Sequence, residues 1–196
     1  MEILYSEPMI RLARNFISTA DADALIDAYD GLLERSTVFD KEGQNYVHEA
    51  RTSFTYFLPS GKGPDDVIWR AERAASAILG VPIHFMEQLQ LVRYHPGQEY
   101  KPHLDYFEDD IMNRTFTIFV YLNDMHPDET GGQTIFPQLG VKVRPQKGAG
   151  VIWTNCVLDK DKMFCDPKLE HGGAPPIKSV KYGLNIWARN APWRTI

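Results

Sequence analysis

The sequence predicts a mainly β domain of the antiparallel sandwich or jelly-roll type, with helices near the N-terminus. From residue 85 onward, short segments rich in β-branched and aromatic residues alternate with turn-forming residues. No helical pattern separates these segments, which argues against a parallel sheet built from βαβ units. The length of 196 residues suits one domain with a sizeable core. Together, these observations favour many short antiparallel strands joined by long loops.

Two amphipathic helices are predicted before the β part. The first follows Ser18 or Thr19 and carries apolar residues at helical spacing as far as Leu33, and Ser18 with Asp21 resembles a capping box. The second begins at Pro64, a favourable first-turn residue, and ends at Gly80. One strand is expected between them at 51–57, flanked by two mobile loops within 38–64.

Five further strands are predicted in the second part of the chain. They cover residues 86–94, 115–122, 141–143, 150–155 and 181–187. Breakers such as His95-Pro96-Gly97 and Gly131-Gly132 stand between them.

The composition limits the classes of partner. Lys and Arg number 21 and Asp and Glu 26, a formal charge of −5, so nucleic acid and anionic membranes are not expected as partners. No apolar run reaches the length of a membrane span, and no secretion signal is visible, so we expect a cytoplasmic protein. In that compartment Cys156 and Cys165 are expected to be reduced. The sequence does not indicate the oligomeric state.

Two H-x-D patterns could supply metal ligands. On a strand, residues i and i+2 share a face, so His103 and Asp105 would present an imidazole and a carboxylate together. With a distant histidine, such a pair forms the 2-His-1-carboxylate set of non-haem Fe(II) oxygenases. The second pattern, His126-Pro127-Asp128, lies in a turn-forming cluster and is interpreted as a surface turn. Without further support, a hydrogen-bonded histidine at a strand start would be the favoured interpretation of His103.

That support comes from the last strand and the segment before it. His171 precedes the strand that begins at Lys181, where Lys181, Gly183, Asn185 and Trp187 share one face. A lysine inside a barrel is costly unless an anion neutralises it, and a dicarboxylate cosubstrate would do so. The hydroxyl groups of Tyr94 and Thr117 could bind the same carboxylate. The alternative is a lysine at a strand end that reaches solvent.

Four segments follow one another in the second part of the chain, and they are RYHPGQEYKPHLDYF (93–107), RTFTIFVYLND (114–124), GGQTIFP (131–137) and HGGAPPIKSVKYGLNIW (171–187). In this order they resemble the catalytic domain of prolyl 4-hydroxylases, which are Fe(II)- and 2-oxoglutarate-dependent dioxygenases. The likeness covers nearly the whole chain, and its specificity lies in the ordered co-occurrence of the segments.

The resemblance implies a role for each matching residue. His103, Asp105 and His171 fall on the iron ligands, and Lys181 falls on the residue that binds the distal carboxylate of 2-oxoglutarate. The hydroxyl partners of that carboxylate correspond to Tyr94 and Thr117. Trp187 matches an aromatic residue that lines the site.

The resemblance also implies the fold and the domain organisation. The expected fold is a double-stranded β-helix, a cupin-like jelly-roll barrel. Residues 1–196 would form a single dioxygenase domain. Within it, 1–84 would give helical and strand support, and 85–196 would form the jelly-roll core with the metal site.

The implied reaction is hydroxylation of peptidyl proline, with oxidative decarboxylation of 2-oxoglutarate to succinate and CO₂. Iron, 2-oxoglutarate and O₂ would take part, with ascorbate as reductant, and the partner would be a proline-containing peptide or protein. The loops 38–64 and 123–140 are candidates for closure over the substrate. The stretch 106–114 is short for the family, which keeps a free amino acid or another small molecule open as the substrate. A non-catalytic jelly-roll binding module is the third alternative.

Overall fold

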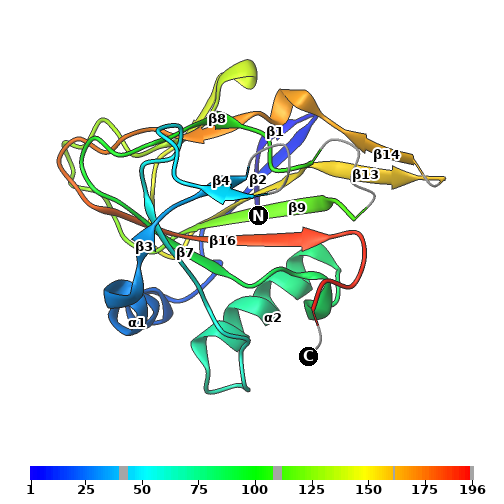
Figure 1. The fold of residues 1–196 in the computed structure, drawn as a ribbon, viewed down its shortest axis with the longest axis horizontal. Coiled ribbons are helices and arrows are strands. Elements are labelled where there is room, and N and C mark those ends of the chain that lie inside the picture. Colours follow the sequence, from blue (N-terminus) through cyan, green and yellow to red (C-terminus); the bar gives the residue numbers. More distant parts are fainter. Residues whose placement is uncertain (40–43, 108–111, 161, 195–196) are drawn as a thin grey trace.

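The structure has three layers, which are a pair of helices, a large sheet and a small sheet (Figure 1). This computed structural model describes residues 1–39, 44–107, 112–160 and 162–194. The helices are α1 (Thr19–Tyr29) and α2 (Val67–Leu79), with short 3₁₀ helices η1 (Asp30–Leu32), η2 (Ile83–Phe85), η3 (Pro137–Leu139) and η4 (Pro167–Leu169). The strands are β1 (Glu2–Ser6), β2 (Met9–Ala13), β3 (Glu34–Arg35), β4 (Val38–Phe39), β5 (Asn45–Tyr46), β6 (Phe54–Phe57), β7 (Gln90–Tyr94), β8 (Tyr100–His103), β9 (Arg114–Tyr121), β10 (Thr134–Phe136), β11 (Val141–Val143), β12 (Gly150–Thr154), β13 (Cys156–Asp159), β14 (Lys162–Cys165), β15 (His171–Gly173) and β16 (Lys181–Arg189).

The two main sheets are antiparallel. The large one has the strand order β1-β2-β12-β9-β16-β7-β6-β3, and the small one has the order β11-β10-β15-β8. Two further hairpins, β4–β5 and β13–β14, pair only with themselves among the described residues. This arrangement confirms the mainly β, jelly-roll prediction. Within the described part of the chain, the two sheets are not hydrogen-bonded into a closed barrel.

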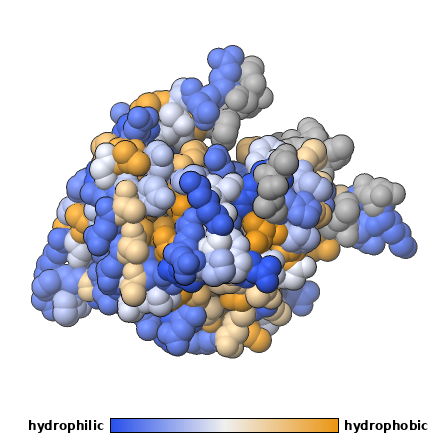
Figure 2. Space-filling view, turned by 90° about the horizontal axis from the view of Figure 1, so that it is seen from below, coloured by the Kyte–Doolittle hydropathy of each residue, from blue (hydrophilic) through white to orange (hydrophobic). Residues whose placement is uncertain are grey.

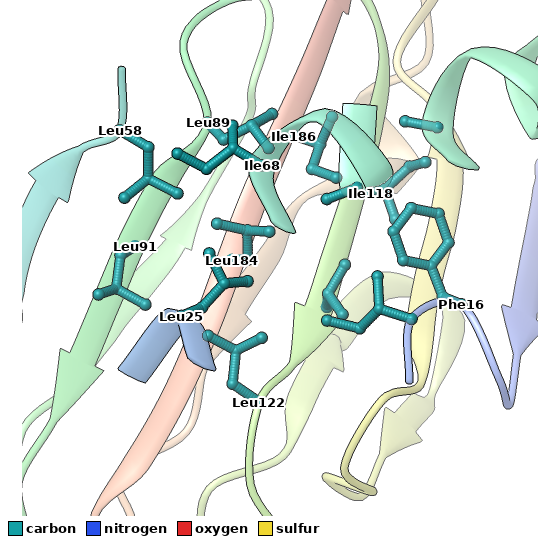
Figure 3. Close-up of a cluster of buried hydrophobic side chains, with 14 of the residues drawn as sticks. Phe16, Leu25, Leu58, Ile68, Leu89, Leu91, Ile118, Leu122, Leu184 and Ile186 are labelled. Carbon is teal, nitrogen blue, oxygen red and sulfur yellow. The ribbon is translucent and has the colours of Figure 1, made fainter. Parts of the chain in front are cut away.

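Alternation along the central strands divides the core into two clusters. On β9, Ile118 and Val120 face the helices, whereas Phe119 and Tyr121 face the small sheet. The first cluster packs α1 and α2 against the large sheet through residues such as Leu25, Ile68, Leu91 and Leu184 (Figure 3). The second cluster fills the space between the two sheets, where the candidate site lies. The division of the domain at residue 84 stays a prediction. Strands from both sides of this residue share the large sheet, with β1, β2, β3 and β6 beside the later strands.

The helices begin and end as local chemistry requires, with two shifts from the prediction. Ser18 caps α1 by accepting a hydrogen bond from the Asp21 N–H, as expected. The α-helix ends at Tyr29, whereas the prediction continued it as far as Leu33. The difference arises because the chain forms the 3₁₀ helix η1 after Tyr29. α2 begins at Val67 with Asp66 as its N-cap, rather than at Pro64, and Gly80 ends it with φ of 70°, a conformation that favours glycine.

Three hairpins were not predicted. β1–β2 extends the large sheet at its edge, β4–β5 pairs within the expected loop before 51–57, and β13–β14 forms within 156–165. In β13–β14, Cys156 and Cys165 are register partners and form a disulfide. The expectation of two reduced cysteines was therefore wrong. The reason is that antiparallel pairing brings two cysteines nine positions apart directly opposite each other.

The face that carries the helices is a mixed surface. Hydrophilic and hydrophobic side chains are interspersed across it (Figure 2). Neither α1 nor α2 combines the length and apolar composition that crossing a bilayer requires.

Candidate functional site

Two histidines and one aspartate converge between the two sheets. His103 ends β8 and His171 begins β15, and the two are register partners in the small sheet. Asp105 follows two residues after His103, beyond the end of the strand rather than on it. One ligand atom from each of the three side chains lies within 4.8 Å of the others. The structure therefore brings together the three residues that the sequence singled out as iron ligands.

Backbone carbonyls orient both imidazoles. His103 Nδ1 donates to the Lys101 carbonyl and His171 Nδ1 donates to the Leu169 carbonyl, each at 2.9 Å. These bonds place the second ring nitrogen, Nε2, toward Asp105, at 3.5 Å from a carboxylate oxygen in both cases. A histidine held in this way has a fixed tautomer and presents Nε2 as the ligand atom.

Asp105 is held by two donors from the large sheet. Thr117 Oγ1 donates to Asp105 Oδ2 at 2.7 Å, and Trp187 Nε1 donates to the same oxygen at 2.9 Å. Burial alone would raise the pKa of Asp105, but the neighbouring His171, His103 and Arg114 outweigh it and lower the pKa below its usual range. Burial lowers the pKa of His171 to about 4 despite the attraction of Asp105. At neutral pH the pair thus offers a carboxylate and a neutral imidazole.

Lys181 lines the same pocket as these ligands and is 1% exposed. Its Nζ is surrounded by the rings of Tyr94, Phe119 and Tyr121, at 5.0 to 5.6 Å from their centroids. In the described part of the chain it forms no ion pair or hydrogen bond, and burial lowers its pKa to about 7. A buried cation of this kind is suited to an anionic ligand.

One pocket contains both the candidate metal ligands and Lys181. Tyr94 and Trp187 lie on its wall, as predicted from the sequence. Thr117 does not, because its hydroxyl faces Asp105, and it receives a 2.8 Å hydrogen bond from Asn155. The threonine on the wall is Thr134, which accepts a hydrogen bond from the Tyr121 hydroxyl at 2.7 Å.

Five wall residues were not predicted from the sequence. Thr134, Gly172 and Gly173 come from the small sheet, and Phe119 and Trp153 come from the large one. The ring of Trp153 lies 4.5 Å from that of His171. Its place in a strand was predicted, but the packing of one sheet on the other could not be deduced from strand patterns. Asn185 also lies on the wall, on the strand face that the sequence assigned to the site.

A network of charges supports Trp187. The Arg114 guanidinium lies 3.9 Å from the Trp187 ring centroid and makes two hydrogen bonds of 2.7 and 2.8 Å to Glu87. Arg189 donates a third bond to Glu87 at 2.8 Å. Glu87 is 7% exposed, so these partners neutralise a buried carboxylate. The network therefore holds Arg114 against the Trp187 ring.

A cleft of about 270 Å³ opens next to the metal ligands. It shares Tyr100, His103, Asp105 and Trp187 with the pocket, so the two are continuous. Its other walls come largely from Thr37 to Phe57 and from the chain after His103. The predicted closing loop 38–64 contributes to it, although residues 40–43 lie outside the described residues, as do 108–111 of the short 106–114 stretch.

The second H-x-D pattern is a surface turn, as interpreted from the sequence. The side chains of His126 and Asp128 are 54% and 74% exposed. Among the described residues, only the set of His103, Asp105 and His171 groups three possible ligands closely enough for a metal.

The arrangement fits the iron and the cosubstrate that the resemblance implies. Two imidazoles and one carboxylate form the donor set that non-haem Fe(II) oxygenases use. The unpartnered, buried Lys181 on the same pocket provides a positive charge for a distal carboxylate.

Comparison with known proteins identifies relatives along nearly the whole chain. The sequence model of the 2OG-Fe(II) oxygenase superfamily matches residues 89–189. Probable prolyl 4-hydroxylase 10 of Arabidopsis thaliana is 30% identical, over 96% of this chain and 71% of the relative. Prolyl 4-hydroxylase 1 of the same plant is also 30% identical, with the same coverage of both chains.

Solved structures share the fold. The viral collagen prolyl hydroxylase vCPH of Paramecium Bursaria Chlorella virus-1, in its 2OG complex, gives a TM-score of 0.73 at 24% identity, over 93% of this chain and 96% of that chain. A prolyl-4-hydroxylase from Pseudomonas putida gives 0.64 at 21% identity, over 93% and 92% of the two chains. The three-layer architecture is thus that of a double-stranded β-helix.

Proposed function

The chain belongs to the 2OG-Fe(II) oxygenase superfamily and is a 2-oxoglutarate-dependent dioxygenase of the prolyl 4-hydroxylase group, and from this premise we propose that it hydroxylates proline within peptides. The observation that carries the proposal is the single pocket that joins His103, Asp105 and His171 to Lys181. Relatives named as prolyl 4-hydroxylases match the chain from end to end. A non-catalytic binding module would need neither the three ligands nor a buried lysine.

Each residue of the pocket has a role in this proposal. His103, Asp105 and His171 hold Fe(II), which supplies the oxidative chemistry with 2-oxoglutarate and O₂ when bound. Lys181 pairs with the distal carboxylate of 2-oxoglutarate, and the wall hydroxyls of Tyr94 and Thr134 are placed to hydrogen-bond it. Thr117, assigned to this carboxylate from the sequence, instead positions Asp105. Trp187 both positions Asp105 and borders the pocket.

The adjoining cleft favours a peptide over a free amino acid. Its volume of about 270 Å³ lies beside the metal ligands, and we infer that it receives an extended peptide segment next to the site. Tyr100 and Tyr106 line it and could contact a polyproline segment. Tyr56, by contrast, stacks on Tyr29 beside the helices. Ascorbate as the reductant and a cytoplasmic location remain proposals that follow from the sequence.

Mass spectrometry tests the proposal. The protein is incubated with Fe(II), 2-oxoglutarate and ascorbate, and either a panel of proline-rich peptides or free proline, with Asp105→Ala as the inactive control. Addition of one oxygen to a peptide proline by the wild type alone supports it. Succinate formation with oxygen added only to free proline or to another small molecule would retain the oxygenase and reject the peptide substrate.

A further inference from the structure

The disulfide-bonded hairpin joins two segments that lead to the metal ligands. β13 begins directly after Asn155, and β14 ends directly before Asp166. The hairpin projects beyond the two main sheets (Figure 1). The Cys156–Cys165 disulfide crosses its base, where the two segments meet.

The first segment reaches Asp105 through Asn155. Asn155 is 2% exposed, and its Nδ2 donates to Thr117 Oγ1 at 2.8 Å. Thr117 Oγ1 in turn donates to Asp105 Oδ2 at 2.7 Å. Because the asparagine amide occupies a lone pair of the threonine oxygen, the threonine proton is directed at the carboxylate. Asn155 thus helps set the orientation of the Asp105 carboxylate.

The second segment reaches His171 through η4. Asp166 N–H donates to the Asn155 carbonyl at 3.1 Å, and the Asp166 carbonyl accepts from Leu169 N–H at 3.1 Å. The Leu169 carbonyl is the group that orients His171 Nδ1. Cys165 stands directly before this segment. The base of the hairpin therefore connects to two of the three metal ligands.

Besides its own ladder, the hairpin is held at its base by backbone hydrogen bonds from Asn155 N–H to the Thr115 carbonyl at 2.8 Å and from Asp166 N–H to the Asn155 carbonyl at 3.1 Å. In the part of the chain that the structure describes, it pairs with no third strand. Its cross-strand pair Val157 and Phe164 is 56% and 57% exposed, so these side chains bury little surface. A two-stranded hairpin with little packing is only marginally stable in water. The disulfide is the covalent constraint that keeps the two segments together.

We propose that the Cys156–Cys165 disulfide is a redox-sensitive positioning device for the iron site. Intact, it holds Asn155 against Thr117 and holds the Leu169 carbonyl against His171. After reduction, Cys156 and Cys165 no longer hold the two segments together, the segments separate, and the affinity of the site for metal falls. The inference rests on the proposed function only in taking Asp105 and His171 as metal ligands.

The chemical step is thiol–disulfide exchange with a dithiol reductant. Cys165 is half-buried and Cys156 is buried, so the reductant thiolate attacks Cys165 Sγ. The Sγ–Sγ bond breaks, and Cys156 leaves as a thiolate that takes up a proton. The second thiol of the reductant then forms its own disulfide and releases Cys165 as a thiol. The reductant is oxidised by two electrons, and the protein disulfide is reduced by two.

Titration with Co(II), followed by its visible absorption, tests the proposal without turnover. Oxidised protein is compared with protein that has been reduced by dithiothreitol and desalted anaerobically, and with the Cys156→Ser/Cys165→Ser double variant. We expect the Kd for Co(II) to rise about tenfold or more in both proteins that lack the disulfide, the reduced wild type and the double variant. Equal Kd values in oxidised and reduced protein would overturn the proposal. Absence of Co(II) binding by the oxidised wild type would instead overturn the metal assignment of the proposed function, and this proposal with it.

A second variant separates positioning from folding. Asn155→Ala removes the amide that directs the Thr117 hydroxyl, and Asn15→Ala is the matched control at an exposed position. We expect Asn155→Ala to weaken Co(II) binding about tenfold and alter the Co(II) absorption bands while the disulfide is intact. Unchanged absorption bands and an unchanged Kd in a folded Asn155→Ala protein would show that the hydrogen bonds from Asn155 through Thr117 to Asp105 do not affect metal binding, which would contradict the proposal.

Discussion

Lys181 and Tyr94 are register partners on neighbouring strands, and Lys181 Nζ lies 5.4 Å from the Tyr94 ring centroid. The lysine is thus buried against aromatic rings on the same pocket as His103, Asp105 and His171. Aromatic rings offset only a small part of the cost of burying an ammonium group. An anionic ligand that pairs with Lys181 would therefore remove most of the free-energy cost of burying this ammonium group.

The first prediction concerns cosubstrate affinity. Lys181→Met keeps much of the side-chain volume and removes the charge, so a bound dicarboxylate would lose its cationic partner. We expect the KM for 2-oxoglutarate to rise roughly 100-fold or more, as for loss of a buried ion pair. Steady-state assays of succinate formation measure this. Lys178→Met, at an exposed position, is the matched control, and a KM that changes equally in both variants contradicts the assignment.

The second prediction concerns the pH dependence of stability. Burial lowers the pKa of Lys181 from 10.5 to about 7. Between these values the unfolded chain binds a proton that the folded protein does not, so this lysine's contribution to stability rises with pH. We expect ligand-free Lys181→Met to be more stable than the wild type at pH 7, by about 2–5 kcal/mol. Urea unfolding should show the difference narrowing toward pH 10.5. A stability difference between the two proteins that stays constant from pH 7 to pH 10.5 would contradict the lowered pKa of Lys181.

The third prediction concerns the space beside Phe119. A Cβ atom on Gly183 would lie 2.3 Å from the Phe119 ring, which lines the pocket. Gly183→Ala should therefore displace the ring toward the pocket, lower stability by about 1–3 kcal/mol and raise the KM for 2-oxoglutarate. Gly31→Ala, where a Cβ meets nothing within 4 Å, is the control for thermal unfolding and kinetics. Unchanged kinetics in Gly183→Ala would show that the ring does not bound the cosubstrate space.

The fourth prediction concerns the loop between His171 and Lys181. The buried Glu129 carboxylate accepts hydrogen bonds of 2.7 to 3.0 Å from four backbone N–H groups, three of them at 177–179. Burial opposes ionisation, but these bonds outweigh it and lower the pKa of Glu129 to about 2. Its contribution to stability is present above pH 4.5 and is lost as the pH falls from 4.5 toward 2.

Glu129→Gln should cost about 1–3 kcal/mol at pH 7, because the amide cannot accept all four bonds. Urea unfolding at pH 7 and pH 3 measures the effect, with the exposed Glu49→Gln as control. The wild type should lose more stability than Glu129→Gln between the two pH values. Parallel losses would contradict the role of the ionised carboxylate.

Local patterns predicted part of the site, and packing determined the rest. Strand alternation placed Lys181, Asn185 and Trp187 on one face, and all three line the pocket. The same reasoning placed Asp105 on a strand with His103, whereas the chain leaves β8 at His103 and reaches the site through a bend. His171 was proposed as the distant partner because it precedes the Lys181 strand, and the family resemblance, confirmed by the comparisons, then matched it to an iron ligand.

The threonines show why the sequence alone was insufficient. Thr117 and Thr134 both lie on strands near the site, but only the stacking of the small sheet on the large one decides which borders the pocket. The disulfide was missed for a similar reason, because the residues 156–165 carry no strong turn signal that would predict a hairpin and pair the two cysteines.

The central claim is that His103, Asp105, His171 and Lys181 form one site for Fe(II) and 2-oxoglutarate. The most direct test is anaerobic titration of the Fe(II) protein with 2-oxoglutarate, followed by the visible charge-transfer absorption of a 2-oxoacid chelated to Fe(II). We predict a saturable band in the wild type, no band in Asp105→Ala, and a band in Lys181→Met only at far higher 2-oxoglutarate concentration. No band in the wild type, or bands with the same midpoint in all three proteins, would contradict the account.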